Sequence, residues 1–423
     1  MSLRDPLQCD VAIAGGGMVG LSLAAALATL PLDIVVIEPV APEADEQPSF
    51  DARTTALSGG SRRVLEGIGV WPAVAAQATP IRRIHVSERG VLGFARLTAE
   101  EQGVAALGYT IENRLLGRAL RARCAGIARL TLCHAGVRDV SPHADQVRLG
   151  TDQGQEIVAR LVVAADGAQS RVRNALGIGA TVSEYGQHAV IAHLDTGRFH
   201  EYTAYERFTA SGPIAMLPIA EGRSAVVWTL APGQAQRVMA LPDAAFIAEL
   251  QLAFGLRLGR FTRVGRRQSY PLALTRAARQ AGPRAVIIGN AAQGLHPVAG
   301  QGFNLGLRDV ATLAEVLADA LAEHHAADPG AARTLEAYAR WRDPDRTAVI
   351  RFTDALIRGF GSRLGPLRAA RASGLLLFDL LSPVKREFAR RTMGLAGRLP
   401  RLLRGLPLQA GGAAPAVRSV HET

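Results

Sequence analysis

The feature that most constrains this chain is a glycine-rich turn between an apolar strand and a helix near the N-terminus. Val11–Ala14 is an apolar run, Gly15–Gly20 reads GGGMVG, an Ala/Leu-rich stretch continues to Leu30, and a second apolar run ends at Glu38. This order predicts strand, turn, helix and strand within about thirty residues, which is the unit that opens a doubly wound α/β fold.

The glycines of this turn have separate predicted roles. Gly15 permits the tight turn, Gly17 lets the backbone approach a pyrophosphate, and Gly20 allows the helix to pack closely on the strand. The helix N-terminus then faces the phosphates. The Glu38 carboxylate is placed to accept hydrogen bonds from the ribose hydroxyls of an adenosine. The unit therefore favours dinucleotide binding over an accidental glycine turn.

Two later apolar strands also end in polar residues. Leu161–Ala165 runs into Asp166-Gly167, and Ala285–Asn290 is followed by a Gly300–Gly302 turn that opens a helix to about Leu321. In an open α/β sheet the carboxyl ends of parallel strands form the ligand-binding edge. Each unit alone is explained by an ordinary connection between a strand and a helix, but three in this order favour one nucleotide site.

With these motifs the sequence resembles the single-component flavoprotein monooxygenases of the aromatic hydroxylase type, over about Asp10 to Arg351. The glycine turn with Glu38 matches the FAD adenosine motif of that family, Asp166-Gly167 its DG motif and Gly289-Asn290 its GD motif. Within the family the chain is most similar to the ubiquinone-biosynthesis hydroxylases. That similarity is carried by DARTTALS at 51–58 and PVAGQGFNLGLRD at 297–309. The branch that the sequence resembles most is that of the 2-polyprenyl-6-methoxyphenol hydroxylases, through GNAAQ at 289–293, LHP at 295–297 and ERFT at 206–209.

The resemblance implies an activity as well as a fold. NADPH or NADH reduces a non-covalent FAD, O₂ adds to give a flavin C4a-hydroperoxide, and one oxygen atom passes to the aromatic ring of a polyprenylated phenol. No metal and no catalytic triad are needed. The sequence holds no second GxGxxG unit, so the reductant is expected to bind transiently.

The resemblance also implies which residues contact the cofactor. The expected FAD-contacting residues are Gly15, Gly17, Gly20, Glu38, Arg53, Asn113, Asp166, Gly289, Asn290, Gly300, Gln301, Gly302, Phe303 and Asn304. Asn290 stands where the wider family usually has Asp, and its amide oxygen can still accept a hydrogen bond from the ribityl chain. A surface salt bridge is the alternative for Arg53, and a helix cap is the alternative for Asn113.

The catalytic and substrate residues are implied in the same way. Pro297 is expected to lie against the isoalloxazine, with the amides of 300–304 stabilising negative charge on the ring. His296 is either a proton-transfer group or a packed histidine. Four residues are candidates for lining the substrate site, with core packing as the alternative for each: Phe208, Leu217, Pro218 and Trp228.

The predicted architecture is α/β (α+β): a Rossmann-like FAD-binding domain, a second, largely antiparallel sheet that binds substrate, and a C-terminal helical region. The FAD-binding domain is expected over 1–180 and 269–350, with a short excursion into the substrate domain near 80–100. Alternating apolar residues predict the strands of the substrate domain over 181–268. Residues 351–423 form the basic helical region.

Charge is concentrated in that C-terminal region. The stretch 355–408 has eleven basic residues and two acidic ones, within a chain of net charge +11. Beside apolar runs, this composition favours peripheral contact with an anionic membrane, with docking onto a partner in a quinone-biosynthesis complex or a cap over the FAD domain as alternatives. No nucleic-acid partner is expected. Three cysteines without a CxxC pair and no leader or spanning segment predict a reducing, cytoplasmic location at the inner face of the membrane.

Two other function classes remain open from the residues alone. FAD proteins of this fold also reduce isoprenoid double bonds or oxidise amines without activating O₂, although the run at 297–309 argues against them. A non-catalytic FAD-binding component of the biosynthetic complex is the second alternative.

Overall fold

The structure is a computed structural model of the 423-residue chain. The described residues are 5–40, 51, 53–91, 93–296, 300–324, 327–361, 374, 378–379 and 381–408.

The first sheet is built around β1 (Leu7–Ala14), whose last four residues are at most 1% exposed. It pairs in parallel with β2 (Ile34–Ile37) and β11 (Glu156–Ala164). Further strands extend the sheet at both edges, in the order β18-β19-β11-β1-β2-β8, with β10 paired to β11 and β9 paired to β10. Their bounds are β8 (Leu130–Cys133), β9 (Val137–Pro142), β10 (Val147–Thr151), β18 (Ala281–Gly282) and β19 (Ala285–Ile287).

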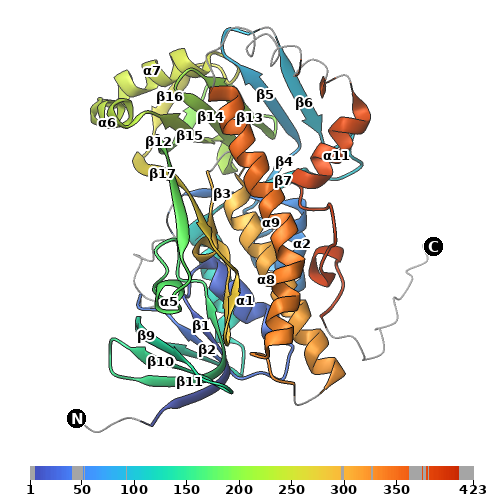
Figure 1. Cartoon of the computed structure of the whole chain (residues 1–423). Coiled ribbons are helices and arrows are strands. Elements are labelled where there is room, and N and C mark those ends of the chain that lie inside the picture. The colour runs from blue at the N-terminus through green and yellow to red at the C-terminus, as the bar shows by residue number, and fades with distance from the viewer. Residues whose placement is uncertain are drawn as a thin grey trace, which may run out of the picture.

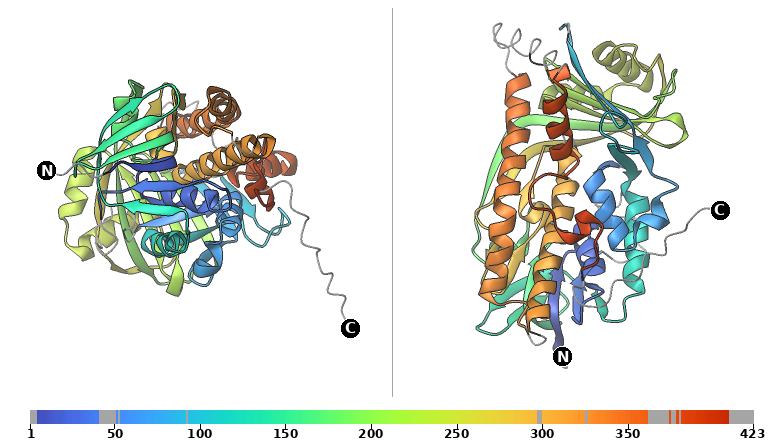
Figure 2. Two further views of the ribbon diagram at one scale, coloured as in Figure 1. Left: turned by 90° about the horizontal axis from the view of Figure 1, so that it is seen from below. Right: turned by 90° about the vertical axis from the view of Figure 1, so that its right-hand side faces the viewer.

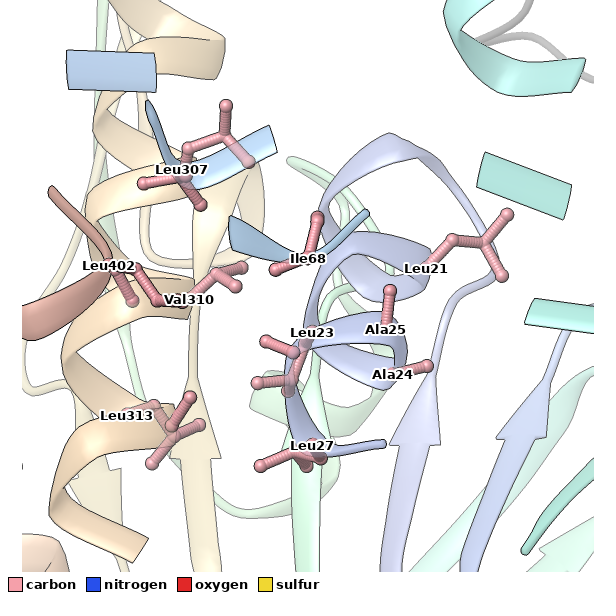
Figure 3. Packing of buried hydrophobic residues seen from close by; sticks show 14 of the residues in the cluster. Leu21, Leu23, Ala24, Ala25, Leu27, Ile68, Leu307, Val310, Leu313 and Leu402 are labelled. Atoms are coloured by element: carbon pink, nitrogen blue, oxygen red, sulfur yellow. The ribbon is translucent and has the colours of Figure 1, made fainter. Parts of the chain in front are cut away.

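Three helices form a layer on this sheet. The first is α1 (Met18–Leu27), which packs through Leu23 and Leu27 against Leu313 of α8 (Gln301–Glu323) in one hydrophobic cluster, as Figure 3 shows. The long α9 (Ala332–Gly361) lies beside α8. Because α8 is buried along most of its length, its N-terminus is fixed against the rest of the molecule.

The second sheet has nine strands and is mostly antiparallel, in the order β20-β17-β12-β15-β14-β13-β5-β6 with β16 beside β12. Two of its strands, β5 and β6, come from early in the chain, and β17 continues beyond residue 268. The bounds are β5 (Arg83–Glu88), β6 (Phe94–Thr98), β12 (Ala180–Thr196), β13 (Thr203–Thr209), β14 (Gly212–Pro218), β15 (Ser224–Leu230), β16 (Phe261–Val264), β17 (Gln268–Ala277) and β20 (Gln293–Gly294).

Two helices cover one face of this second sheet. They are α6 (Pro232–Ala240) and α7 (Asp243–Phe254), and Figure 1 shows them on the side away from α8 and α9. Phe246, Leu250 and Phe254 of α7 bury one stripe at helical spacing in the cluster beneath the helices. We call the opposite face, which is turned toward the first domain, the inner face.

A small three-stranded sheet connects the two large ones. Its order is β3-β7-β4, and helices α2, α3 and α4 follow its strands. The bounds are β3 (Thr54–Ser58), β4 (Thr79–Ile81), β7 (Gly108–Glu112), α2 (Gly59–Gly67), α3 (Trp71–Val74) and α4 (Asn113–Ala125). Three short helices lie elsewhere in the chain: α5 (Arg171–Ala175) and the 3₁₀ helices η1 (Ala220–Gly222) and η2 (Gly289–Ala291).

The described C-terminal residues pack back onto both domains. Helix α11 (Ser382–Thr392) buries Ala389 against Leu97 of β6, and η4 (Arg401–Arg404) buries Leu402 in the cluster shared with α1 and α8. Figure 2 shows this segment running alongside the long helices. Among the described residues no helix is long and apolar enough to cross a bilayer.

Candidate flavin-binding active site

The carboxyl ends of four parallel strands meet in register. Ala14 of β1 lies opposite Ile37 of β2 and Ala164 of β11, and Ala164 lies opposite Ile287 of β19. The residues that follow these four ends are the predicted glycine turn, Glu38, the DG motif and Gly289-Asn290. We call Gly289-Asn290 the GN turn. The structure therefore brings motifs that are far apart in the sequence to one edge of the sheet.

Two glycines of the turn have no room for a side chain. Gly15 has a φ of +105°, and a Cβ there would lie 2.5 Å from the Ala165 carbonyl oxygen. A Cβ on Gly20 would lie 1.9 Å from the Gly15 carbonyl oxygen, because the helix crosses the strand closely. Gly17 is the N-cap of α1, and no side chain among the described residues caps this helix. Its first amides are therefore available to an anion.

Glu38 lies against the turn. Its Oε2 accepts a hydrogen bond from the Gly16 amide at 2.7 Å, and its Oε1 accepts one from the Val40 amide at 3.0 Å. Carboxylate oxygens can accept further hydrogen bonds. The ribose contact of Glu38 stays a prediction.

Asp166 carries an acceptor that the protein does not use. Its Oδ2 accepts a hydrogen bond from the Val172 amide at 3.1 Å, whereas its Oδ1 is buried and has no hydrogen-bond partner among the described residues. A buried acceptor without a partner is costly unless a ligand supplies one. Together with the uncapped amides of α1, it fits a ligand that has both hydroxyl donors and phosphates, as FAD has.

A buried ion network supports the GN turn. Oδ2 of Asp309 accepts hydrogen bonds from the Gly289 amide at 3.0 Å and from Gln293 at 2.7 Å. Oδ1 of Asp309 accepts one from Nε of Arg342, and Arg342 also pairs with Asp345. Burial by itself would raise the pKa of Asp345, but the positive charges of Arg308 and Arg342 outweigh it and hold that pKa below its usual range. The Asn290 side chain itself is exposed at the strand end.

The start of α8 is fixed by Asn304. Its side chain accepts hydrogen bonds from the Ser58 amide at 2.8 Å and the Ser61 hydroxyl at 2.6 Å, and it donates to the carbonyls of Ala56 and Gly300. Since these contacts use the whole amide, only the backbone of Asn304 remains for a flavin.

The neighbouring residues of the 300–304 segment differ in their surroundings. Gln301 is buried, Phe303 packs on the hydrophobic core, and a Cβ on Gly302 would meet no atom of the described residues within 4 Å. Gly300 has a φ of +61° and faces Ala56. Because Gly302 has no side chain, a ring can approach the helix N-terminus there.

Arg53 and Asn113 lie together beside this edge. The Arg53 guanidinium pairs with Asp51 at 2.5 Å and lies 4.9 Å from the ring centroid of Tyr270. Asn113 is only 4% exposed, accepts a hydrogen bond from Thr55 and donates one to Asp51. Asn113 is therefore an interior residue that positions the Arg53 segment, and it does not cap α4, whose N-cap is Glu112.

His296 has the environment of a packed histidine. It is 1% exposed, meets the Tyr185 ring edge-on at 5.3 Å, and burial lowers its pKa to about 4. Its burial, its ring contact and a pKa far from that of an efficient acid or base at pH 7 favour the packing alternative. Pro297, the other predicted catalytic residue, lies outside the described residues.

The four predicted substrate residues lie differently on the second sheet. Leu217 and Phe208 are on the inner face, and Phe208 stacks on Phe360 of α9 at 3.6 Å between centroids. The prediction for Trp228 is wrong, because its side chain points to the other face and packs on Phe246 of α7 in the core. Pro218 is buried at the end of β14, where its carbonyl accepts a hydrogen bond from Thr110.

Sequence reasoning missed several residues of this region. Asp309 and Glu206 stand inside the quoted motifs, but no pattern in the sequence assigns them a partner or a face. His193 on the inner face joins the two domains through Thr54 at 3.1 Å, across 139 positions of sequence. Alternation along Ala189–Leu194 shows only that His193 and Ile191 share a face.

Comparison with known proteins agrees with this site. Residues 8–353 match the family model described as FAD binding domain. The chain belongs to this FAD-binding family.

Full-length relatives carry the comparison further. A ubiquinone hydroxylase, UbiL, of Rhodospirillum rubrum is 41% identical, over 94% of this chain and 93% of its own. The 3-demethoxyubiquinol 3-hydroxylase of Escherichia coli is 34% identical, over 91% and 98%. A crystal structure of the p-nitrophenol 4-monooxygenase PnpA of Pseudomonas putida covers 93% of this chain and 99% of its own with a TM-score of 0.75, at 19% identity, and so shows the fold.

These findings confirm three predictions. The chain is a flavin-dependent hydroxylase of the monooxygenase class, FAD is its cofactor, and its fold is the expected α/β arrangement with a second sheet.

Proposed function

We propose that this enzyme hydroxylates the aromatic ring of a polyprenylated phenol in ubiquinone biosynthesis, using FAD, NADPH or NADH, and O₂. The observation that carries the proposal is the similarity to ubiquinone hydroxylases along nearly the whole chain, combined with the meeting of the nucleotide-binding motifs at one edge of the first sheet. When bound, FAD supplies the activation of O₂.

The protein's own contribution is to bind, orient and keep out water. Around Glu206 the inner face carries apolar side chains on adjacent strands, namely Ala215, Leu217, Val227 and Phe208. Apolar walls suit an aromatic ring and limit the entry of water, which would otherwise divert the activated oxygen. The uncapped N-terminus of α8 provides amides that stabilise negative charge on the flavin ring.

A deletion strain tests the proposal. We expect it to accumulate 2-polyprenyl-6-methoxyphenol, identified by mass spectrometry of the lipid extract. Accumulation of a precursor that already carries the next ring oxygen would assign the enzyme to another step of the pathway. Normal ubiquinone in a strain that has no second copy of the gene would contradict the proposal.

Labelled oxygen separates the hydroxylase from the two other classes. Purified holoenzyme supplied with NADPH, ¹⁸O₂ and a short-chain prenylated phenol should place one ¹⁸O atom in the ring. A reductase of isoprenoid double bonds would instead add two hydrogen atoms to the chain. A non-catalytic FAD protein would consume no NADPH or NADH beyond one equivalent.

We also propose that α11 holds the enzyme at an anionic membrane surface, where a substrate with a polyprenyl chain would reside. Leu381 and Val384 are 48% and 49% exposed at the start of this helix, and Arg386, Arg390 and Arg391 are exposed along it. Exposed apolar residues beside basic ones are typical of helices that lie in the interface. Docking onto a partner of a quinone-biosynthesis complex is the alternative occupant of this surface.

A further inference from the structure

A carboxylate lies in the apolar inner face of the second sheet. Glu206 of β13 lies opposite Ala215 of β14 on one side and Val86 of β5 on the other. Its neighbours along β13 on this face are Ala204 and Phe208. The opposite face of the same strands carries Met216 and Tyr205, which pack toward α7. Glu206 therefore points toward the flavin-binding domain, from an apolar row.

This carboxylate has an unused oxygen. Oε1 of Glu206 is shut off from bulk solvent and has no hydrogen-bond partner among the described residues. The residue as a whole is only partly buried. A buried acceptor without a donor is unfavourable, and a ligand hydroxyl that donates to it would remove this cost.

The surroundings raise the pKa of Glu206 into the range of an efficient general base at neutral pH. Burial alone raises its pKa to about 7, and no charged neighbour opposes the shift. Arg207 and His85 belong to the same strands but face the other side of the sheet. Glu88 of β5 lies opposite Phe208 and is a second carboxylate on the inner face. From α9, the side chain known to pack here is Phe360, which is uncharged.

We propose that Glu206 is the catalytic residue that binds the phenolic hydroxyl of the substrate and takes its proton. This role rests on the proposed function, which it deepens. A phenol ring held against Ala215 and Leu217 has its hydroxyl within the apolar inner face, where a carboxylate is the natural acceptor. The ring attacks an electrophilic oxygen faster as a phenolate, because the charged oxygen donates electron density into the ring.

The proton transfer balances without another reactant. The phenolic O–H bond breaks, its electron pair stays on the phenolate oxygen, and the proton forms a new O–H bond on the Glu206 carboxylate. Transfer of the oxygen atom forms a C–O bond at the ring carbon, which then carries a hydroxyl group and a hydrogen, while the former phenolate oxygen becomes a ketone. The ring carbon then loses its proton and the ketone oxygen gains one, which restores the aromatic ring as a neutral diol. The proton that Glu206 took is used when the second oxygen atom of O₂ leaves as water, and the carboxylate is ionised again.

The decisive test is the pH dependence of Glu206→Gln holoenzyme, with 2-geranyl-6-methoxyphenol as substrate and NADPH in excess. At pH 7 we expect kcat for the ring product to fall by about 100-fold, within the range for loss of a general base. In the parent enzyme kcat should fall below about pH 7, as Glu206 becomes protonated. In the variant that limb should vanish, and activity should rise toward about pH 10, where a phenol ionises unaided.

Three further variants separate this role from a structural one. Glu206→Leu, which suits an apolar face, should stay folded and yellow, oxidise NADPH, and release hydrogen peroxide in place of ring product. Glu206→Asp should recover part of the activity and the low-pH limb. Glu88→Gln, a matched change on the adjacent strand, should keep the parent pH profile.

The outcomes are distinguishable. A yellow parent enzyme that forms no ring product overturns the proposed function and, with it, this role. An active parent enzyme with an unchanged kcat and pH profile in Glu206→Gln overturns the role of Glu206 alone. Loss of kcat that is equal at every pH also overturns it, since a merely structural change has no reason to follow ionisation of the substrate.

Discussion

At the scale of single residues, two kinds of buried polar side chain are informative. One kind makes all its hydrogen bonds to the protein, and the other keeps an atom that has no partner among the described residues. Asn304 uses its whole amide on Ser58, Ser61, Ala56 and Gly300, and so fixes a helix start. Asp166 keeps one buried oxygen without a partner among the described residues, and so does Glu206. Asn304 is therefore a positioning residue, whereas Asp166 at the nucleotide edge and Glu206 on the inner face each keep an oxygen that a ligand can use.

The sequence could predict the glycines but not these polar roles. Gly15 and Gly20 follow from a local spacing, because the turn and the close helix crossing involve neighbouring residues. Asn304 meets Ser58 across 246 positions, and such a partner is invisible to a pattern. Trp228 failed for a related reason: alternation groups residues into two faces but does not say which face meets the helices.

Burial of Glu206 predicts how stability depends on pH. Its folded pKa of about 7 lies above the ordinary value of 4.5, so the folded state binds the proton more tightly than the unfolded state. This group's contribution to stability is therefore fully present below about pH 4.5 and is lost as pH rises through about 7.

Glu206→Gln cannot ionise, so its Tm should exceed that of the parent at pH 8, and the difference should shrink toward pH 5. Differential scanning calorimetry of both holoenzymes at matched flavin content measures it. If the difference in Tm between Glu206→Gln and the parent is the same at pH 5 and at pH 8, ionisation of Glu206 is not coupled to folding.

The Gly17 backbone predicts a variant that folds without its cofactor. Gly17 has a φ of −70° and a ψ of −177°, which a valine adopts without strain. Gly17→Val should therefore fold, yet its side chain should block the approach of a pyrophosphate to α1, giving colourless protein. The ratio of flavin to protein absorbance and the circular dichroism spectrum measure the two effects. Full flavin occupancy would contradict this account of the turn.

At the scale of elements, apolar runs predicted the strands and helices that build the nucleotide edge. Strands β1, β2, β11 and β19 and helices α1 and α8 all lie where such runs occur. Helices α6 and α7 were not predicted between strands of the second sheet, although Phe246, Leu250 and Phe254 repeat at helical spacing. These three residues span only two turns of helix, and the segments around them alternate between apolar and polar residues as strands do. The helical spacing was therefore not recognised.

Asp309 of α8 connects Arg342 of α9 to the Gly289 amide of the GN turn, and this network gives a prediction at this scale. Asp309→Asn removes the charge that faces the fully buried Arg342 and weakens the acceptor for the Gly289 amide. Breaking a buried pair on one side costs about 3 kcal/mol in the free energy of unfolding. Flavin affinity should fall as well, because the turn carries Asn290.

Asp319→Asn is the matched control on the same helix. Asp319 is 42% exposed and pairs with Arg401 at 2.6 Å, so its loss should cost less than about 1 kcal/mol. Chemical denaturation of the two variants and the parent, together with flavin titration of the apoproteins, compares them. Equal costs for both variants would show that the buried network does not support the turn.

At the scale of the whole molecule, the C-terminal segment has two faces with different predicted roles. Ala389, Met393 and Leu402 are buried against both domains, which is the arrangement of a cap. Lys385 is buried between Glu101 and Asp379, which ties α11 to the loop after β6. The exposed arginines lie on the remaining surface of α11. Truncation would therefore remove core residues along with the charges, and point substitutions are the appropriate test of the membrane proposal.

Flotation of the intact enzyme with phosphatidylglycerol-containing vesicles tests the exposed surface. Each basic residue near an anionic surface contributes about 1 kcal/mol, so replacing Arg386, Arg390 and Arg391 by Gln should weaken the partition by up to about 100-fold at low salt. Glu387 pairs with Arg390 and Arg391 and neutralises part of their charge, so the measured loss of membrane binding should be below this upper value.

The matched control replaces three exposed, ion-paired arginines of the first sheet region with Gln. Arg129, Arg138 and Arg148 are 57%, 64% and 51% exposed, and the change in net charge is the same. If net charge alone drove the partition, both triple variants would lose it equally. If α11 lies on the membrane, only its own variant loses the partition, and adding salt reduces that of the parent and of the control variant. Failure of the parent to float at low salt would instead leave α11 as a cap whose exposed arginines serve solubility or bind another protein.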